Sequence, residues 1–478
     1  MTDPRDRIDT WLTTEVEPLA PPPGTFERIR RRARRRKANR ALMSAAGVLV
    51  VIAAAVVAPR VAGTLLQGGG QAGPAAAAGA APPSAQPRPT GQGNGSLNAK
   101  SGTKVTPPTS ALSPGGSGQP VPGNFQPTSV TFIGPHLGAA IGQASTPGHC
   151  ATAYCTSLAG TSDYGTSWYG VSAPLTGPPA GALGVSQLRF LDAHDGWAFG
   201  PQLWVTHDGG GHWTQEQTYG LRVTDLETAG DRAFAVFATC TGTGPGYAAD
   251  CTSFSLYSAP ASGGQWQPVP GPVANLQAAS GGQAAAASLM LTGGPGGGTG
   301  YLLSPSGALL SGPLNGKPWS LVSRAAPCAP GAPGTAGQPT GALLAGDSGR
   351  LILACTSATS TAGDTQTKTV TESTNGGVSW SGGGTAPPAG LAAAVSVQGQ
   401  VVVLATDAGL YLSGNGGGSW RLTQGSPAGA AAGSPGFSYV GMTSPADGVA
   451  LPADPGLHEV FITTDGGSTW RPRLISSP

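Results

Sequence analysis

Charged side chains are scarce in this chain of 478 residues. Asp, Glu, Lys and Arg make up 10% of it, against about 25% in an average soluble domain. The formal net charge is +2 and 39% of the residues are hydrophobic, so a highly charged disordered chain is excluded. The charge that is present is uneven, because residues 1–40 carry 11 Lys and Arg but 6 Asp and Glu. The remainder carries 14 and 17, and this mildly acidic balance disfavours nucleic acid as a partner.

One long apolar run without charge follows the basic cluster of residues 28–40. Residues 41–58 read ALMSAAGVLVVIAAAVVA, and residues 61–66 extend the run. Eighteen helical residues span about 27 Å, close to the thickness of a bilayer core. The run is longer than the apolar stretch of a cleaved signal peptide, and a twin-arginine signal or a nucleic-acid patch explains the arginines less simply. We therefore expect a single-pass membrane anchor at residues 41–66, with the N-terminus cytoplasmic and the C-terminal part extracellular.

Two further segments lack the apolar residues that a folded domain needs. Residues 1–40 are too few to bury a core and are interpreted as a basic cytoplasmic tail lying on anionic headgroups, with a docking peptide as the alternative. Residues 67–126 are rich in Pro, Gly and Ala, and we expect a disordered linker there. This leaves residues 127–478 for the folded part.

Glycine and proline are abundant, at 78 and 45 residues, which makes a helical bundle improbable. The glycines recur with tryptophan. Seven of the ten tryptophans are separated by 40 to 61 residues, a period typical of propeller blades. They are Trp168, Trp213, Trp266, Trp319, Trp380, Trp420 and Trp470.

Five of these tryptophans end an eight-residue segment with the pattern Ser/Thr-x-Asp/Asn-x-Gly-x-x-Trp. The segments are 161–168, 206–213, 373–380, 413–420 and 463–470. Segments 259–266 and 312–319 keep only the Gly and the Trp. Asp or Asn bonds nearby backbone N–H groups, Gly supplies positive φ, and Trp anchors the next strand. Each segment is therefore predicted to be a turn between two antiparallel strands.

A second pattern repeats upstream of three of these turns. An apolar residue is followed six positions later by glycine and then by a short apolar strand. The pairs are Phe132 and Gly138, Phe190 and Gly196, and Met442 and Gly448. Together the two patterns give four strands per unit. The fold class expected is all-β, a β-propeller of seven four-stranded blades, with six or eight as alternatives.

The eight-residue pattern resembles the Asp-box, or bacterial neuraminidase repeat, of sialidases, sortilin-type receptors and photosystem II assembly factors. The resemblance covers residues 127–478 and implies a propeller in which the box is a structural turn. The residues that carry it are Asp163, Gly165, Trp168, Asp208, Gly210, Trp213, Asn375, Gly377, Trp380, Asn415, Gly417, Trp420, Asp465, Gly467 and Trp470.

All six cysteines lie in the part expected outside the cell: Cys150, Cys155, Cys240, Cys251, Cys328 and Cys355. An even number confined to an exported region predicts disulfides. Pairs of sequence neighbours are favoured among the 15 possible connectivities. Free buried thiols are the alternative, and the absence of a Cys-x-x-Cys motif disfavours a metal site.

The sequence assembles no catalytic site. Sialidase chemistry, as the resemblance implies it, needs an arginine cluster, a Tyr nucleophile with a Glu partner, and an Asp acid, and the early Arg-Ile-Pro motif is absent. Only Glu216, Glu227, Glu372 and Glu459 lie beyond the anchor. A two-carboxylate glycosidase could use Asp192, Asp195, Asp225 or Asp231, but solvated turn carboxylates are the simpler interpretation. Asp163, Asp208 and Asp465 form too thin a ligand set for calcium, and the histidines lack zinc spacing, so neither a cofactor nor a metal is expected.

These observations predict a membrane-tethered extracytoplasmic propeller that binds or scaffolds an unknown protein or glycan ligand without enzymatic activity. A sialidase-like glycoside hydrolase is one alternative. A transmembrane sensor whose cytoplasmic tail binds a regulator such as a sigma factor is another. The Ala-, Gly-, Pro- and Arg-rich composition is typical of a high-GC, actinobacterial source.

Overall fold

The structure, a computed structural model, describes part of the chain. The described residues are 111–476 except 114–117, 135, 146–154, 178–183, 242–249, 278–286, 294–296, 329–338, 348, 360–365 and 388. Every described residue belongs to one compact unit within Gly102–Pro478. The tail and the anchor expected at 1–40 and 41–66 thus lie outside the described residues. Within the described part, no helix has the length and apolarity needed to cross a bilayer.

Seven four-stranded antiparallel sheets make up the folded unit, which confirms the expected β-propeller of seven blades. Each blade uses four consecutive strands, and blade 3 adds the short strand β13 beside β11. Blade 1 comprises β1 (Gln126–Phe132), β2 (Gly138–Ala144), β3 (Cys155–Thr161) and β4 (Tyr169–Val171); blade 2 comprises β5 (Gln187–Phe190), β6 (Gly196–Phe199), β7 (Leu203–Thr206) and β8 (Thr214–Gln215); blade 3 comprises β9 (Arg222–Ala229), β10 (Arg232–Cys240), β11 (Cys251–Pro260), β12 (Gln267–Pro268) and β13 (Leu276–Gln277); blade 4 comprises β14 (Ser288–Thr292), β15 (Thr299–Leu303), β16 (Leu309–Pro313) and β17 (Ser320–Ser323). Blade 5 comprises β18 (Pro339–Asp347), β19 (Arg350–Thr359), β20 (Gln366–Ser373) and β21 (Ser381–Ala386); blade 6 comprises β22 (Ala392–Gln398), β23 (Val401–Thr406), β24 (Gly409–Ser413) and β25 (Arg421–Gly425); blade 7 comprises β26 (Phe437–Met442), β27 (Gly448–Pro452), β28 (Glu459–Thr463) and β29 (Arg471–Leu474).

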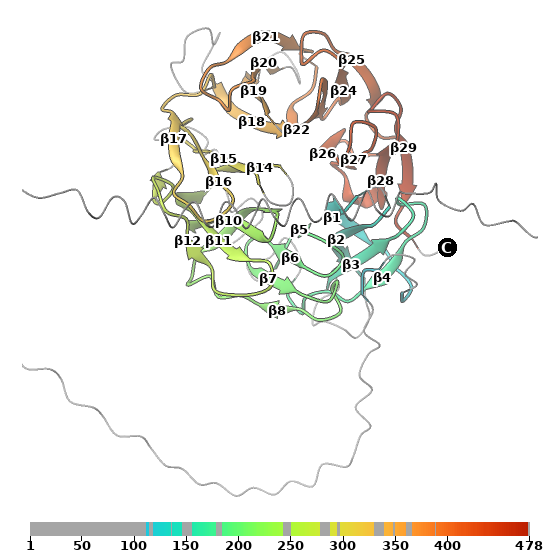
Figure 1. The fold of residues 1–478 in the computed structure, drawn as a ribbon. Coiled ribbons are helices and arrows are strands. Elements are labelled where there is room, and N and C mark those ends of the chain that lie inside the picture. Colours follow the sequence, from blue (N-terminus) through green and yellow to red (C-terminus); the bar gives the residue numbers. More distant parts are fainter. Residues whose placement is uncertain are drawn as a thin grey trace, which may run out of the picture. The chain divides into compact units, whose positions relative to one another are not determined.

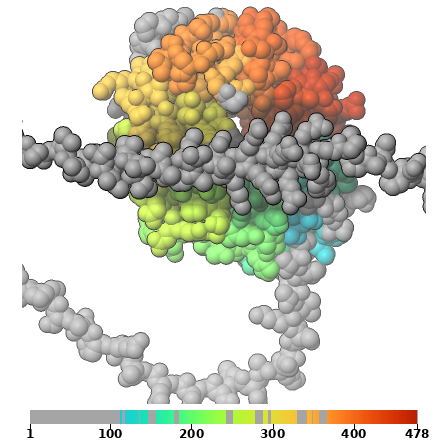
Figure 2. All heavy atoms as spheres, viewed as in Figure 1, coloured from blue at the N-terminus to red at the C-terminus, as the bar shows by residue number. Residues whose placement is uncertain are grey.

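The blades follow one another around a ring in chain order, so the colour changes continuously around it (Figures 1 and 2). The first strand of each blade lies nearest the axis, and neighbouring first strands contact one another. The apolar core lies between blades rather than at the axis. For example, Phe234 and Val236 of blade 3 share one buried cluster with Leu289 and Leu302 of blade 4. The middle strands, buried on both faces, therefore carry apolar residues at consecutive positions.

The glycines of the second repeated pattern have a packing role. The first strand ends at Phe132 in blade 1 and at Phe190 in blade 2, and Gly138 and Gly196 begin the next strands. Each glycine pairs directly with its aromatic residue across the two strands. A Cβ atom would lie 2.6 Å from a ring atom of Phe132 at Gly138 and 2.4 Å from one of Phe190 at Gly196. The pattern thus marks a hairpin in which the aromatic ring packs directly on the backbone of the paired glycine.

One boundary differs from the expectation, because the end of the expected linker 67–126 packs on the propeller. Leu112 is 4% exposed and its N–H donates to the carbonyl of Gly209, 2.7 Å away. Gln119 pairs with Gly170 beside β4, and Phe125 is fully buried. Composition does not reveal this segment, because its apolar residues are few and pack in clusters formed by the blades, as Leu112 and Phe125 do. It also covers part of the outer edge of blade 1, which would otherwise present unpaired backbone groups.

Two of the expected cysteine pairs are disulfides in the structure, Cys240–Cys251 and Cys328–Cys355. The first joins the end of β10 to the start of β11, and the second ties the segment before β18 to β19. Cys155 is disulfide-bonded as well, while Cys150 lies outside the described residues.

Candidate functional site

The eight-residue segments all join the third strand of a blade to the fourth. Thr161 ends β3 and Tyr169 begins β4, and the same relation holds around the ring. The fifth position is glycine in all seven segments, with φ between +75° and +97°. That backbone conformation disfavours any side chain, which explains why glycine persists in the two segments that lost the acid.

The polar residues of the five complete turns are used within the turn. The first-position hydroxyl accepts a hydrogen bond from the glycine N–H at 2.8–2.9 Å. It donates to the Asp or Asn oxygen at 2.9 Å, and that oxygen also accepts from the N–H of the seventh residue at 2.8–2.9 Å. The tryptophan packs in a cluster shared with the preceding blade, as Trp168 does with Val449. Each turn therefore holds two blades together.

Asp465 provides a test of this turn chemistry. Burial raises its pKa, but hydrogen bonds from the N–H and hydroxyl of Thr469 and from Thr463 outweigh burial and lower it. We expect Asp465→Ala to lower the free energy of unfolding by about 1–3 kcal/mol in urea denaturation. Asp465→Asn should change it little, because Asn375 makes the equivalent bonds in its own turn.

The contribution of Asp465 to the free energy of unfolding depends on pH. Because the folded-state pKa is lowered, the contribution of Asp465 is present above about pH 4 and is lost as the pH falls through the lowered pKa. The asparagine variant should lack this loss. Equal destabilisation by alanine and asparagine would contradict the hydrogen-bonding role.

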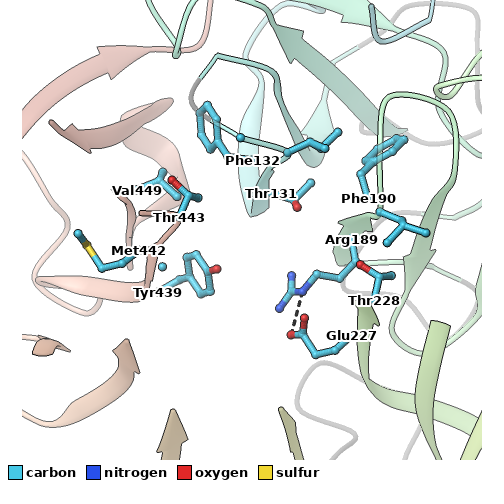
Figure 3. Close-up of a pocket in the computed structure, with 14 residues that line it drawn as sticks. Thr131, Phe132, Arg189, Phe190, Glu227, Thr228, Tyr439, Met442, Thr443 and Val449 are labelled. Carbon is cyan, nitrogen blue, oxygen red and sulfur yellow. Dashed lines mark hydrogen bonds and ion pairs between the residues drawn. The ribbon is translucent and has the colours of Figure 1, made fainter. Parts of the chain in front are cut away.

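The polar groups of the turns are thus used within the turns, and a pocket lies instead near the axis of the ring. A pocket of about 450 Å³ lies where β1, β5, β9 and β26 end, with β27 alongside. Its floor is polar, with Arg189, Glu227 and Tyr439. Three threonines and several apolar residues complete the lining (Figure 3). The threonines are Thr131, Thr228 and Thr443, and the apolar residues are Phe132, Ile133, Phe190, Leu191, Met442 and Val449.

An ion pair organises the floor of the pocket. The Nε of Arg189 lies 3.0 Å from Oε1 of Glu227, and Nη1 donates to the carbonyl of Leu188 at 2.8 Å. The side chains of Arg189 and Glu227 are 16% and 30% exposed, so a ligand could reach both. Arg189 and Tyr439 point toward the same space from opposite sides (Figure 3). Burial alone would lower the pKa of Arg189, but Glu227 outweighs it, so the guanidinium stays charged.

A second carboxyl group lies behind the floor. Asp225 is two positions before Glu227 on β9, on the same face of the strand, and its Oδ2 accepts a hydrogen bond of 2.8 Å from the N–H of Leu289. Burial and the charge of Glu227 raise the pKa of Asp225 to about 7. Burial also raises the pKa of Tyr439, although Arg189 opposes the shift. The cluster thus holds two carboxyl groups and one guanidinium.

Sequence reasoning named only part of this cluster. Asp225 and Glu227 are among the carboxylates that the sequence singles out, whereas Arg189 and Tyr439 are not indicated by either motif considered there. The other three aspartates considered are not in the pocket lining; Asp192 caps a turn, Asp195 pairs with His207 at 2.7 Å, and Asp231 is exposed. Among the described residues, no three His, Cys, Asp or Glu side chains are placed to hold a metal ion.

A signal for the missed residues exists in the second repeated pattern. Thr131, Arg189 and Gly441 each precede the apolar residue of that pattern, and all three line the pocket. Because side chains alternate along a strand, the residue before a core-facing one faces away from that core. In the first strand of a blade, a side chain that faces away from that core faces the axis. Tyr439 lies two positions before Gly441 on β26, so the same alternation places it toward the axis as well.

The solved structures named below are less than 20% identical to this chain. No protein-family model and no curated protein matches the chain. Among solved structures, YCF48 bound to a D1 peptide is 17% identical over 72% of this chain and 94% of that one, with a TM-score of 0.46. YCF48 from Cyanidioschyzon merolae is 16% identical over 60% and 83%, with a TM-score of 0.39. An ancestral GH74 enzyme is 13% identical over 76% of this chain and 48% of its own, with a TM-score of 0.45.

Proposed function

We propose that this propeller is a non-enzymatic binding module whose axial pocket takes a cationic side chain from a partner protein. The observation that carries the proposal is a pair of carboxyl groups with one guanidinium: Glu227 is paired with Arg189 on the floor, and Asp225 lies behind them. When both carboxyl groups are ionised, this cluster has one net negative charge. Such a floor attracts a lysine or arginine side chain and repels a carboxylate or a phosphate.

The walls of the pocket fit a peptide segment. Ile133 and Leu191 add partly exposed apolar surface beside the charged floor, and the hydroxyls of Thr131 and Thr228 lie in the same lining. A cavity of about 450 Å³ accommodates a few side chains rather than a folded surface. We therefore infer that a short segment of the partner enters the axis while its remainder contacts the surrounding hairpins.

The proposal includes the location expected from the sequence. Residues 41–66 would anchor the chain, and the preceding arginines would keep residues 1–40 in the cytoplasm, so that the propeller acts on the outer face of the membrane. Protease added to intact cells should then remove the propeller and spare the tail.

The binding proposal is tested by photo-crosslinking in intact cells that carry the full chain. A benzoylphenylalanine is placed at Thr443, an exposed residue of the pocket lining. We expect one partner protein whose crosslinked peptide contains lysine or arginine. Glu227→Gln should reduce the crosslink about tenfold or more, because it removes the negative charge that faces the cation.

A matched control is available in blade 5. Arg350 and Glu372 form a second ion pair, with Nε and Oε1 2.7 Å apart, and neither residue lines the pocket. Glu372→Gln makes the same chemical change there and should leave the crosslink intact. Equal crosslinking by the Glu227 variant and the wild type would overturn the proposal.

A glycoside hydrolase of the sialidase type is the second candidate. The structure brings Tyr439, Glu227, Asp225 and Arg189 together, which are the residue types that the resemblance implies. The raised pKa of Tyr439 and the single arginine argue against a sialidase reaction on an anionic sugar. Turnover of sialosides or plant glycans by the full chain, lost in Asp225→Asn and Tyr439→Phe, would establish this candidate instead.

A further inference from the structure

The ring is closed without a shared strand. Blade 1 consists of β1–β4 and blade 7 of β26–β29, and no described strand belongs to both sheets. One contact is the hydroxyl of Tyr164, which lies 3.0 Å from the carbonyl of Thr463 and 3.2 Å from that of Gly448. Tyr164 has φ of +60° at a turn position where four other blades have glycine. A side chain is thus kept in a strained conformation at the junction, which we call the seam.

A second cavity, of about 190 Å³, lies at the seam on the opposite edge of the blades from the axis. Arg471 and Arg473 of β29 line it from blade 7, together with Thr464 and Thr469 of the preceding turn. Tyr164 and Thr166 line it from blade 1. We call this cavity the seam pocket. Its two arginines are two positions apart on one strand, so both side chains lie on the same face.

The arginines of the seam pocket are not neutralised by the protein. Within the described residues, the ion pairs involve other groups, and no carboxylate lies within 4.0 Å of either guanidinium. The Nε of Arg473 is buried and has no hydrogen-bond partner there. A buried donor without an acceptor costs free energy, and a ligand oxygen would remove that cost.

The carboxylates nearest in sequence are engaged elsewhere. Both oxygens of Asp465 accept hydrogen bonds from Thr469, and those of Asp163 accept bonds from Ser167. Both groups are therefore fixed within their own turns. The hydroxyls of Thr469 and Thr166 donate to Asp465 and to the carbonyl of Asp163. What remains at the seam pocket is a pair of guanidinium groups, which suits an acceptor with two or more oxygens.

We propose that the seam pocket binds a small oxyanion, a carboxylate, sulfate or phosphate, which links blade 7 to blade 1. The guanidinium groups of Arg471 and Arg473 donate to the anion, and the anion lies against Tyr164 and Thr166 of blade 1, which line the same cavity. The bound anion stabilises the closed ring at the junction of blades 7 and 1, which are not consecutive in the chain. This role is independent of the axial pocket, where the charge has the opposite sign.

The test is thermal unfolding of the full chain with sodium acetate, sulfate or phosphate replacing chloride at constant ionic strength. We expect at least one oxyanion to raise the midpoint saturably by about 1–3 °C. Which of the three does so identifies the preferred anion. Arg471→Gln/Arg473→Gln should lose the saturable rise and keep only the linear effect of bulk salt.

Arg421→Gln is the matched control. Arg421 follows Trp420 as Arg471 follows Trp470, but its guanidinium bonds Ser468 and does not line the seam pocket. This variant should respond to the anion as the wild type does. A rise that is identical in all three proteins, or absent from all three, would overturn the proposal. If the double variant does not fold, Arg471→Gln alone is compared by phosphorus NMR line broadening of inorganic phosphate.

Discussion

Replacing Arg189 with methionine should lower the free energy of unfolding by about 3–5 kcal/mol at pH 8. The wild-type guanidinium lies 3.0 Å from Glu227 and close enough to Asp225 to affect its pKa. Without it, two partly buried carboxylates on one face of β9 would repel each other with no cation between them. Urea denaturation of the wild type and the variant measures the difference.

The pH dependence separates this electrostatic effect from lost packing. At pH 5 the loss should be smaller, because Asp225 and Glu227 of the variant can take up protons and lose their repulsion. Adding Glu227→Gln to Arg189→Met should restore part of the stability at pH 8. A loss that is equal at both pH values would show that the arginine acts through its aliphatic contacts alone.

The same carboxyl group sets a pH trend in the wild type. The folded-state pKa of Asp225, about 7, is above the unfolded value, so the folded state binds more protons between about pH 4 and 7. The contribution of this group to stability therefore decreases as the pH rises through that window. Asp225→Asn should lack the decrease, and the same carboxyl must lose its proton before the axial pocket acquires a net negative charge.

Trp168→Ala should also lower the free energy of unfolding, by about 3–5 kcal/mol. The indole is 2% exposed and packs against Val449 and Ile462 of blade 7. Its Nε1 also donates to the carbonyl of Gly165, 3.2 Å away. Because blades 7 and 1 are not consecutive in the chain, the contacts of this side chain help to hold the first blade against the last.

Trp213→Ala provides the comparison. Trp213 occupies the same position in blade 2, but it is only half-buried and its indole donates to the carbonyl of Ser172. The cost there should be smaller, and hydrogen exchange should remain protected at the junction of blades 1 and 7. For Trp168→Ala, amides of β1 and β28 should exchange faster than those of β15. Equal costs and uniform exchange in the two variants would contradict a special role for the seam.

The architecture could be predicted from the sequence because it depends on local repeats. The spacing of the tryptophans gives the blade count, and the glycine six residues after Phe132 or Phe190 gives the first hairpin of a blade. Both patterns are set by contacts within one blade or with the one before. The packed segment around Leu112 escaped prediction because it depends on grooves that exist only after blades 1 and 2 have formed.

The axial pocket could not be predicted in the same way. Thr131 and Tyr439 are far apart in the sequence and meet only because the ring closes. Arg189 and Glu227 belong to adjacent blades, and neither belongs to a repeated motif that marks it as functional. Alternation along the first strands indicates which residues face the axis, but the number and closure of the blades decide which of them meet.

The closure of the ring has a consequence for how the chain could be reordered. Phe125, before the first strand, and Ile475, after the last, are buried in the same cluster. A short peptide joining these two points, with new ends placed between any two other blades, would encode the same seven sheets. Such a circular permutant would make the present seam a continuous stretch of backbone and would move the junction elsewhere. Seven circular permutations of the blade order would therefore give the same ring of sheets. In the present order, the first and the last blade meet at the seam.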